Sequence, residues 1–467
     1  MTATIRPYRE NNPGFPGTVQ VPASKSHTIR RLIIATLANG LTEIEQPLDS
    51  LDTRSCLSVC RGLGAEITEQ PGLWTVRGIA RKKTAQDDNC SPEVKHCDAG
   101  NSGTTLFFAL AAAALGRTPV QFDGDEQLRK RDAGPLLEAL SGLGASVKSA
   151  PGGCAPITVC GPWKGGRVSL PCPTSQYLSA LLLAAPLAPA GLVTEIEVPL
   201  LNEKPYVEMT LSYLDSQEIP YKAARGFSYF CIPGGSAWTP FSGLVPGDFS
   251  SAANIASAAI ISGESVTLLG LDPYDTQGDK VFFDFLSKMG CLVRWEENTI
   301  EQIPLGQSID TGLLAIGQKP LELKTTEWRL TVARRGRLRG GKFDLNNTPD
   351  LLPVMAALAC FARGDTALLN AASARLKESD RIKTMAEELG KLGVKCTEHP
   401  DGLVIHGTGE IPVTGKDIIK TDSRGDHRIA MALACIAPGC PVPMEISGAE
   451  SVGVSYPGFL ELLGAEL

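Results

Sequence analysis

The chain repeats one pattern six times: a short polar turn opens into a stretch rich in alanine and leucine. Apolar residues in these stretches recur at helical spacing, and the turns contain serine, threonine, asparagine or aspartate, which commonly cap helix N-termini. A second amphipathic segment follows each stretch, so the pattern predicts six pairs of helices. The six turns begin at Ser24, Asn101, Pro173, Asp248, Thr348 and Asp426.

In five units, the second helical segment ends in a glycine that precedes alternating apolar and polar residues. Glycine readily adopts the left-handed conformation that ends a helix, and the alternation predicts a strand, as at residues 157–159 and 402–405. The glycines are Gly64, Gly144, Gly290, Gly393 and Gly464. We therefore predict an α/β protein of six related helix–strand units, three in each of two domains.

Length and composition are typical of a soluble protein with at least two domains. The chain has 467 residues, too many for one ordinary core, of which 43% are hydrophobic and 20% charged. The N-terminal residues lack the apolar segment of a signal peptide, and the longest apolar run, residues 178–190, is too short for a membrane span. We expect a cytoplasmic protein without membrane contacts, acting as a monomer.

The charge balance argues against general nucleic-acid binding. The formal net charge is -7, and only 6% of residues are aromatic, which disfavours recognition of stacked bases. The 13 cysteines are scattered, without a C-x-x-C pair or zinc-site spacing, as expected for reduced thiols. An anion site would therefore have to be built locally, from grouped basic side chains and converging helix N-termini.

Two short runs concentrate basic and acidic side chains beside apolar helical stretches. They are R-L-K-E-S-D-R at residues 375–381 and G-D-H-R at residues 425–428. An acid between cations stays ionised and can exchange a proton with a bound molecule, and grouped cations suit a small polyanion. The first run also fits an ordinary charged helix start with i,i+3 pairs, and a lone histidine such as His427 is more often structural.

Eight strings lie in order along nearly the whole chain, on the same repeat. They are V-P-A-S-K-S-H-T-I-R (21–30), G-N-S-G-T-T (100–105), G-D-E-Q-L-R-K-R (124–131), T-S-Q-Y-L-S-A-L-L-L (174–183), K-P-Y-V-E-M-T-L (204–211), T-P-D (348–350), R-L-K-E-S-D-R (375–381) and D-H-R-I-A-M (426–431). Together they resemble the 5-enolpyruvylshikimate-3-phosphate synthase family, also called 3-phosphoshikimate 1-carboxyvinyltransferases. The resemblance implies a two-domain inside-out α/β barrel, with residues 21–246 in one domain, residues 1–20 plus 247–467 in the other, and the active site in the cleft between them.

The resemblance also implies the reaction. The enolpyruvyl group of phosphoenolpyruvate would move to the 5-hydroxyl of shikimate 3-phosphate, with release of phosphate, in chorismate and aromatic amino acid biosynthesis. No metal ion and no organic cofactor are implied. Asp350 would accept the hydroxyl proton, Glu378 would donate a proton, Lys377 would stabilise the departing phosphate, and His427 would lie beside it. Asp350, which follows Pro349, also fits a simple helix cap.

By the same resemblance, two overlapping sets of residues would bind the substrates. Shikimate 3-phosphate would contact Lys25, Ser26, Arg30, Thr174, Ser175, Gln176, Asp350 and Lys377. Phosphoenolpyruvate would contact Lys25, Gly103, Arg131, Gln176, Arg381 and Arg428. Lys25 would serve both substrates and take part in catalysis.

Four positions depart from the family pattern. Phe107 and Val454 stand where a cation is usual, Glu203 stands where a serine often binds the substrate phosphate, and Ser373 replaces an asparagine that can contact it. Two lost cations and one gained acid weaken the attraction for anions, by about 1.5–3 kcal/mol for each lost charge-assisted contact. The candidates to replace the charge are Arg129, Lys130 and Arg424.

These departures leave two alternatives open. Glu203 is consistent with an enolpyruvyl transferase for a different alcohol, and the loss of cations at Phe107 and Val454 is consistent with a non-catalytic descendant that binds phosphorylated ligands. A transferase acting on a cell-wall UDP-sugar is disfavoured. That group commonly carries a cysteine near Arg131, and residues 124–135 contain none.

Overall fold

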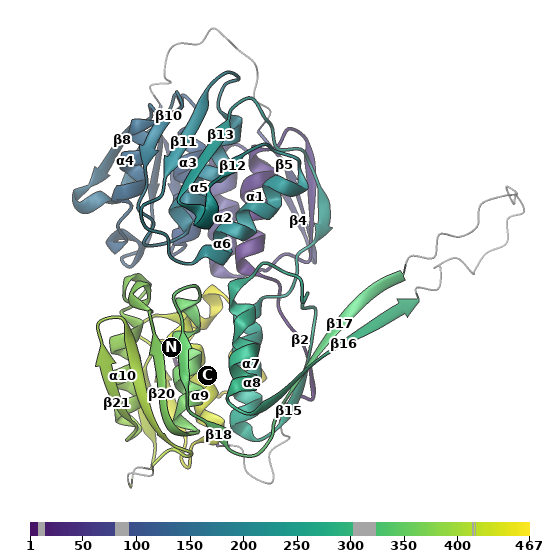
Figure 1. Ribbon diagram of the computed structural model, residues 1–467, viewed down its shortest axis with the longest axis vertical. Helices are drawn as coiled ribbons and strands as arrows, with labels where there is room; N and C mark the ends of the chain where they lie inside the picture. The colour runs from purple at the N-terminus through teal and green to yellow at the C-terminus, as the bar shows by residue number, and fades with distance from the viewer. Residues whose placement is uncertain (8–14, 80–92, 302–323, 413–414, 416) are drawn as a thin grey trace, which may run out of the picture.

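The computed structural model describes residues 1–7, 15–79, 93–301, 324–412, 415 and 417–467. The chain forms two lobes stacked along the long axis of the molecule (Figure 1). The core of the first lobe is built from buried residues between Ile29 and Val245. The core of the second lobe combines buried residues from Ala3 to Val21 with those from Phe249 to Leu463.

Three units build the first lobe, each with two helices and one four-stranded sheet. The first contains α1 (Lys25–Leu37), α2 (Leu51–Leu63) and the strands β14 (Ser242–Leu244), β3 (Leu41–Glu45), β5 (Leu73–Arg77) and β4 (Glu66–Gln70). The second contains α3 (Gly103–Ala113), α4 (Gly134–Gly142), β6 (Lys95–Asp98), β7 (Val120–Asp123), β9 (Cys154–Cys160) and β8 (Ser146–Ala150). The third contains α5 (Gln176–Ala184), α6 (Lys204–Ser216), β10 (Gly166–Ser169), β11 (Val193–Glu197), β13 (Tyr229–Pro233) and β12 (Lys222–Ala223).

The second lobe also contains three helix pairs, each with its sheet. The first has α7 (Phe249–Ser262), α8 (Phe282–Lys288), β16 (Cys291–Glu301), β17 (Lys324–Arg334), β15 (Ser265–Leu269) and β2 (Thr18–Gln20). The second has α9 (Leu352–Cys360), α10 (Arg381–Lys391), β18 (Leu338–Arg339), β19 (Lys342–Asp344), β20 (Ala362–Leu369), β22 (Gly402–Thr408) and β21 (Lys395–His399). The third has α11 (His427–Ile436), α12 (Phe459–Leu462), β1 (Thr2–Ile5), β24 (Met444–Ser447) and β23 (Ile419–Asp422).

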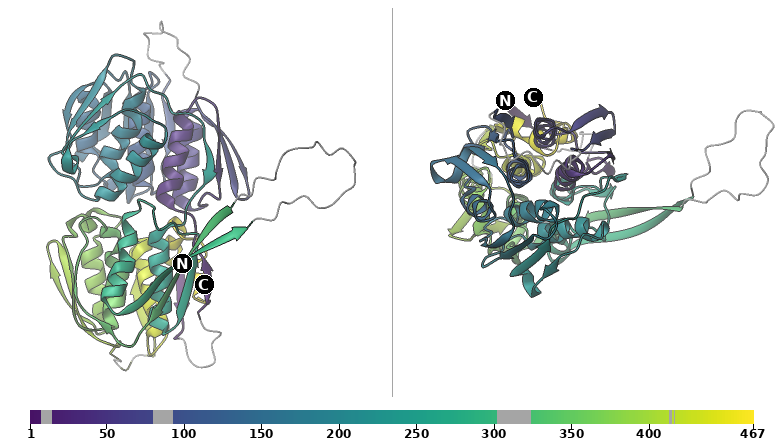
Figure 2. Two further views of the ribbon diagram at one scale, coloured as in Figure 1. Left: turned by 45° about the vertical axis from the view of Figure 1, so that its right-hand side comes forward. Right: turned by 90° about the horizontal axis from the view of Figure 1, so that it is seen from above.

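Short 3-10 turns link these elements. They are Leu128–Lys130, Pro151–Gly153, Ala185–Leu187, Arg225–Phe227, Gly278–Val281, Pro349–Leu351, Ala372–Leu376, Ala437–Gly439 and Ala449–Val454. The strands β16 and β17 pair along their whole length and project from the second lobe (Figures 1 and 2). This hairpin accounts for the longer interval between the fourth and fifth sequence repeats.

Local sequence signals set most helix ends as predicted. The side chains of Ser24, Ser102, Asp248 and Asp426 each accept a hydrogen bond from the first turn of the helix that follows. All five glycines after the second helices have positive φ, from 65° at Gly464 to 119° at Gly64. The predicted capping bond is missing at the other two first helices, because the side chains of Ser175 and Thr348 make none. At Thr348, Pro349 begins a 3-10 turn, and α9 starts only at Leu352.

The first helix of each unit lies inside its lobe. In the first lobe α3 contacts α1 and α5, and in the second lobe α7, α9 and α11 contact one another. The sheets cover these helices from outside, as the view from above in Figure 2 shows. The N-termini of several inner helices point toward the other lobe.

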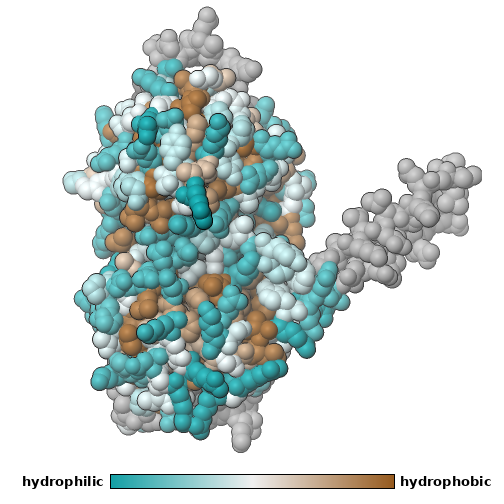
Figure 3. Space-filling model, viewed as in Figure 1, coloured by the Kyte–Doolittle hydropathy of each residue, from teal (hydrophilic) through white to brown (hydrophobic). Residues whose placement is uncertain are grey.

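On the face drawn in Figure 3, polar side chains dominate and apolar residues form scattered patches.

Two chain segments connect the lobes and run side by side. The amide of Ser24 donates to the carbonyl of Pro246 at 2.8 Å, and the amide of Asp248 donates to the carbonyl of Pro22 at 2.8 Å. The strands β1 and β2 thus belong to the second lobe, where β1 pairs with β24 and β2 pairs with β15. Of the helices that the structure describes, none combines the length and apolar character needed to cross a bilayer.

Candidate active site

A cavity of about 610 Å³ lies between the lobes and is lined by residues of both. The structure brings together in it all the residues that the sequence singled out for catalysis and substrate binding. From the first lobe these are Lys25, Ser26, Arg30, Gly103, Arg131, Thr174, Ser175 and Gln176. From the second lobe they are Asp350, Lys377, Glu378, Arg381, His427 and Arg428.

The cavity is positively charged although the chain is acidic overall. Among the residues that the structure describes, nine lysine and arginine side chains line it, against six carboxylates, whereas the formal net charge of the chain is -7. The starts of α1, α3, α5 and α11 also lie at the cavity, because residues of each first turn line it. Exposed backbone N–H groups and helix dipoles there add to the attraction for anions, so the predicted convergence of helix N-termini occurs.

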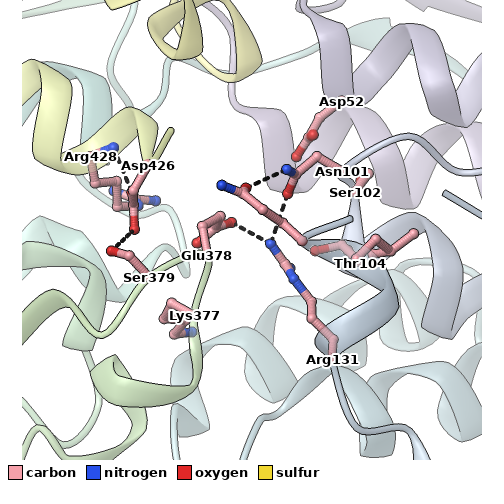
Figure 4. A network of polar contacts seen from close by, with 12 residues as sticks. Asp52, Asn101, Ser102, Thr104, Arg131, Lys377, Glu378, Ser379, Asp426 and Arg428 are labelled. Carbon is pink, nitrogen blue, oxygen red and sulfur yellow. Dashed lines mark hydrogen bonds and ion pairs between the residues drawn. The ribbon is translucent and has the colours of Figure 1, made fainter. Parts of the chain in front are cut away.

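Arg381 is the centre of the polar network on the second lobe. Its side chain is 1% exposed, and it donates to Asp426 at 2.8 Å, to Asp350 at 2.6 Å and to Glu378 at 2.6 Å. The alternative of a solvated helix start for residues 375–381 is therefore wrong. Asp426, which is fully buried, also accepts from Ser379 at 2.9 Å and caps α11 (Figure 4).

Asp350 is held among three cations. Its carboxylate lies 2.6 Å from Arg381, 3.0 Å from Arg428 and 3.6 Å from Lys377. Burial alone would raise the pKa of Asp350, but these three cations outweigh burial and keep the pKa far below its usual range. Without substrates, Asp350 is therefore an ionised carboxylate and a weak base.

Glu378 connects the two lobes. Its carboxylate forms an ion pair with Arg131 of the first lobe at 2.9 Å (Figure 4) and accepts a hydrogen bond from Arg381 of the second lobe at 2.6 Å. Asn101 orients Arg131 by accepting a hydrogen bond of 3.0 Å. Burial opposes the charge on Glu378, but Arg131 and Arg381 prevail and hold its pKa well below the usual range.

Lys25 and His427 face the same part of the cavity. Lys25 pairs with Asp52 at 3.0 Å. Burial and the nearby Lys25 lower the pKa of His427 well below its usual value, so the imidazole is neutral. Both ring nitrogens of His427 are buried, and neither has a hydrogen-bond partner among the described residues.

The described residues include one close group of possible metal ligands. Ligand atoms of Glu378, Asp426 and His427 lie within 4.8 Å of one another. Both carboxylates already accept hydrogen bonds from Arg381, and a cation would have to displace that guanidinium. The donor set is therefore better explained as an arginine clamp than as a metal centre.

On the first lobe, Arg30 is a buried cation without a carboxylate partner among the described residues. It is 1% exposed and donates to the carbonyl of Tyr206 at 2.9 Å and to Thr210 at 3.0 Å. Burial lowers the pKa of Arg30 to about 10, so it remains protonated at neutral pH. On the same lobe, Gln176 donates to Thr104 at 2.9 Å, which joins the starts of α5 and α3.

The four departures from the family pattern lie in different surroundings. Phe107 lines the cavity and packs edge-on against Tyr177, with 5.0 Å between ring centroids. Ser373 and Glu203 also line the cavity. Val454 is buried in the 3-10 turn Ala449–Val454 and does not line it.

Only two of the three residues suggested as replacements for the lost positive charge line the cavity. Lys130 and Arg424 line the cavity. Arg129 does not, because its guanidinium pairs with Asp123 at 2.7 Å on the surface, so the proposed compensation by Arg129 was wrong. The guanidinium of Arg424 also forms an ion pair with the carboxylate of Glu387 at 3.1 Å.

Sequence reasoning missed several residues that position the site. The sequence does contain a signal for Asp426, Asn101 and Thr104, because each lies within one of the eight strings. Their contacts with Arg381, Arg131 and Gln176 could therefore have been predicted. Asp52 has no sequence signal, because nothing in its helix indicates that Lys25 lies against it.

Known proteins match this chain over nearly its whole length. Residues 12–463 match the family described as EPSP synthase (3-phosphoshikimate 1-carboxyvinyltransferase). The chain belongs to the EPSP synthase family. Two relatives of that family named 3-phosphoshikimate 1-carboxyvinyltransferase, from Acetivibrio thermocellus and Halobacterium salinarum, are 42% and 36% identical, covering 96% and 99% of this chain and 95% and 98% of their own. An EPSP synthase structure from Acinetobacter baumannii superposes with a TM-score of 0.75 at 25% identity, covering 99% of this chain and 97% of its own, and it confirms the two-domain inside-out α/β fold.

Proposed function

We propose that this chain transfers the enolpyruvyl group of phosphoenolpyruvate to the 5-hydroxyl of shikimate 3-phosphate and releases phosphate, a step of chorismate and aromatic amino acid biosynthesis. The observation that carries the proposal is the interlobe cavity, where cations outnumber carboxylates in an acidic chain. Two polyanions that repel each other need such a positively charged, partly enclosed space. Family membership supports the same reaction.

Asp350 is the proposed acceptor of the hydroxyl proton. In the cavity without substrates, burial would raise the pKa of Asp350, but Arg428, Lys377 and Arg381 hold it down. Bound phosphate and carboxylate groups would draw these cations away, and the pKa of Asp350 would then rise toward the range of an effective base. Proton removal is thereby tied to the presence of both substrates.

Glu378 is the proposed proton donor to the methylene carbon of phosphoenolpyruvate. The anion of that substrate would occupy Arg131 and Arg381, which now keep Glu378 ionised, so the carboxyl could hold a proton. The 5-oxygen of the acceptor then bonds to carbon 2. In the second half of the reaction, the methyl group would return its proton to the Glu378 carboxylate, the double bond would re-form, and the electron pair of the broken carbon–oxygen bond would leave with phosphate.

The remaining cavity residues divide between the two substrates. Shikimate 3-phosphate is assigned to Lys25, Ser26, Arg30, Thr174, Ser175, Gln176, Asp350 and Lys377. Phosphoenolpyruvate is assigned to Lys25, Gly103, Arg131, Gln176, Arg381 and Arg428. Lys377 and His427 are assigned to the departing phosphate, as a cation and a neutral hydrogen-bonding group.

The test is a coupled assay of phosphate release with the purified chain. Release should require both substrates together and should fall to background when either one is left out. Turnover with another alcohol and none with shikimate 3-phosphate would reject the proposed acceptor. Binding without any turnover on a panel of alcohols would favour the non-catalytic alternative, for which Phe107 is the supporting observation within the cavity.

Three further expectations belong to this proposal. Residues 21–246 and residues 1–20 plus 247–467 would be the two domains, an assignment supported by the two separate buried cores. We also expect a monomer in the cytoplasm. Limited proteolysis, light scattering and cell fractionation would test the three in turn.

A further inference from the structure

One carboxylate in the cavity lies where an anionic ligand would be expected. Glu203 is 2% exposed, and its Oε2 accepts from Thr174 Oγ1 at 3.1 Å, Ser175 Oγ at 3.1 Å and the Ser175 amide at 3.2 Å. Its other oxygen, Oε1, accepts from the ammonium of Lys377. One carboxylate thus receives four hydrogen bonds from both lobes.

These donors are of the kinds that bind a phosphate group. Two hydroxyls, a backbone N–H at the start of α5 and a lysine ammonium offer the neutral and charged contacts that phosphate oxygens accept. Thr174, Ser175 and Arg30 all line the cavity. A phosphate and the Glu203 carboxylate would compete for the same hydrogen atoms, and their like charges would repel. They cannot occupy the position together.

We propose that Glu203 acts as an internal competitor that fills the phosphate subsite of the empty enzyme and leaves it when the phosphorylated acceptor binds. The inference rests on the proposed function, since it assigns this subsite to the phosphate of the acceptor. Glu203 sets the affinity for that substrate and reduces occupancy by free inorganic anions. It is a specificity-determining residue that this chain has in place of a hydroxyl side chain.

The local structure favours a carboxylate that can be displaced. The Glu203 side chain makes no capping bond to α6, so moving the carboxylate would break no bond to that helix. The cavity beside it gives the displaced side chain room. Lys377 would not be left alone, because Asp350 lies 3.6 Å away.

The test compares the binding of inorganic phosphate and of shikimate 3-phosphate, by calorimetry without phosphoenolpyruvate, in the original chain and in three variants. Glu203→Gln keeps the shape and removes the charge, and Glu203→Ser provides a second variant with a small hydroxyl. Glu208→Gln, on the exposed face of the same helix, is the matched control. Both Glu203 variants should bind the two ligands at least about tenfold more tightly, and the control should bind as the original chain does.

A double variant tests whether the gain arises at this subsite. Ser175→Ala combined with Glu203→Gln removes one proposed phosphate donor, so the tenfold gain should shrink to less than about threefold. Unchanged or weaker phosphate binding in both Glu203 variants would overturn the inference and identify Glu203 as a structural bridge to Lys377. Because these measurements need no turnover, absence of catalysis with shikimate 3-phosphate would count against the proposed function alone.

Discussion

Replacing Asp350 by asparagine should separate binding from catalysis. The substitution keeps the size of the side chain but removes one negative charge from among three cations at 2.6 Å, 3.0 Å and 3.6 Å. Arg381, Arg428 and Lys377 would then attract substrate anions more strongly. A unit charge about 6 Å from a bound anion changes its energy by roughly 3 kcal/mol at an effective dielectric constant of about 20, which is an upper limit for the gain.

The same substitution removes the proposed base, so the rate should fall. A general base typically contributes about 100-fold or more, which corresponds to at least about 2.7 kcal/mol in the activation barrier. Asp350→Asn should therefore lower kcat at least about 100-fold while the KM and the calorimetric Kd for phosphoenolpyruvate fall or stay constant. Loss of a mere binding contact would instead raise KM.

The assay is steady-state phosphate release, combined with calorimetric titration of phosphoenolpyruvate. Asp284→Asn, an exposed carboxylate on α8 of the same lobe, is the matched control for loss of charge, and its kcat should stay within about twofold. A near-normal kcat in Asp350→Asn, or a KM that rises several-fold, would refute the assignment of Asp350 as the base.

Four other substitutions test separate parts of the site. Glu378→Gln should lower kcat about 100-fold or more without preventing substrate binding, and a rate close to normal would remove it from the mechanism. Gly103→Ala would place a Cβ against Nη1 of Arg131, so inhibition constants for phosphoenolpyruvate analogues such as glyphosate should rise; unchanged constants would contradict this placement. Asp426→Ala breaks the buried pair with Arg381 and should cost about 3–5 kcal/mol in the free energy of unfolding, measured with urea; a loss below about 1 kcal/mol would show that Arg381 finds other partners. Burial raises the pKa of Asp279 to about 6, above its value in the unfolded chain, so the free energy of unfolding should fall as pH rises from about 4 to 6. Asp279→Asn should therefore stabilise the chain at pH 8 but not at pH 4. An equal effect at both pH values would contradict the shift.

Short-range signals explain why so much of the fold could be predicted from the sequence. A capping serine or aspartate acts within one helical turn, and a glycine such as Gly64 ends a helix through its own φ angle, so both leave a local trace. The helix start predicted at Thr348 was placed too early, because Pro349 favours a tight 3-10 turn over a direct helix start. The length of β16 was not predicted because three consecutive polar residues, Glu296, Glu297 and Asn298, interrupt its alternation of apolar and polar side chains.

The contacts inside the cavity were less accessible to sequence reasoning. The resemblance placed Glu378 and Arg131 in one site, but their direct ion pair depends on how two lobes meet, and spacing along the chain does not encode this. The same holds for Glu203, which was recognised as unusual only by its identity. Its bonds to Ser175 and Lys377 arise from segments that are distant in the sequence.

The two parallel connections between the lobes affect the order in which the chain can fold during synthesis. β1 is made before the first lobe, yet it pairs with β24, which is made after most of the second lobe, as in the pair Thr2 and Ser447. The first lobe is complete once Val245 has been made and can fold while β1 and β2 still lack their neighbours. β1 must therefore stay unpaired until β24 has been made, whereas β2 can pair as soon as β15 follows the first lobe.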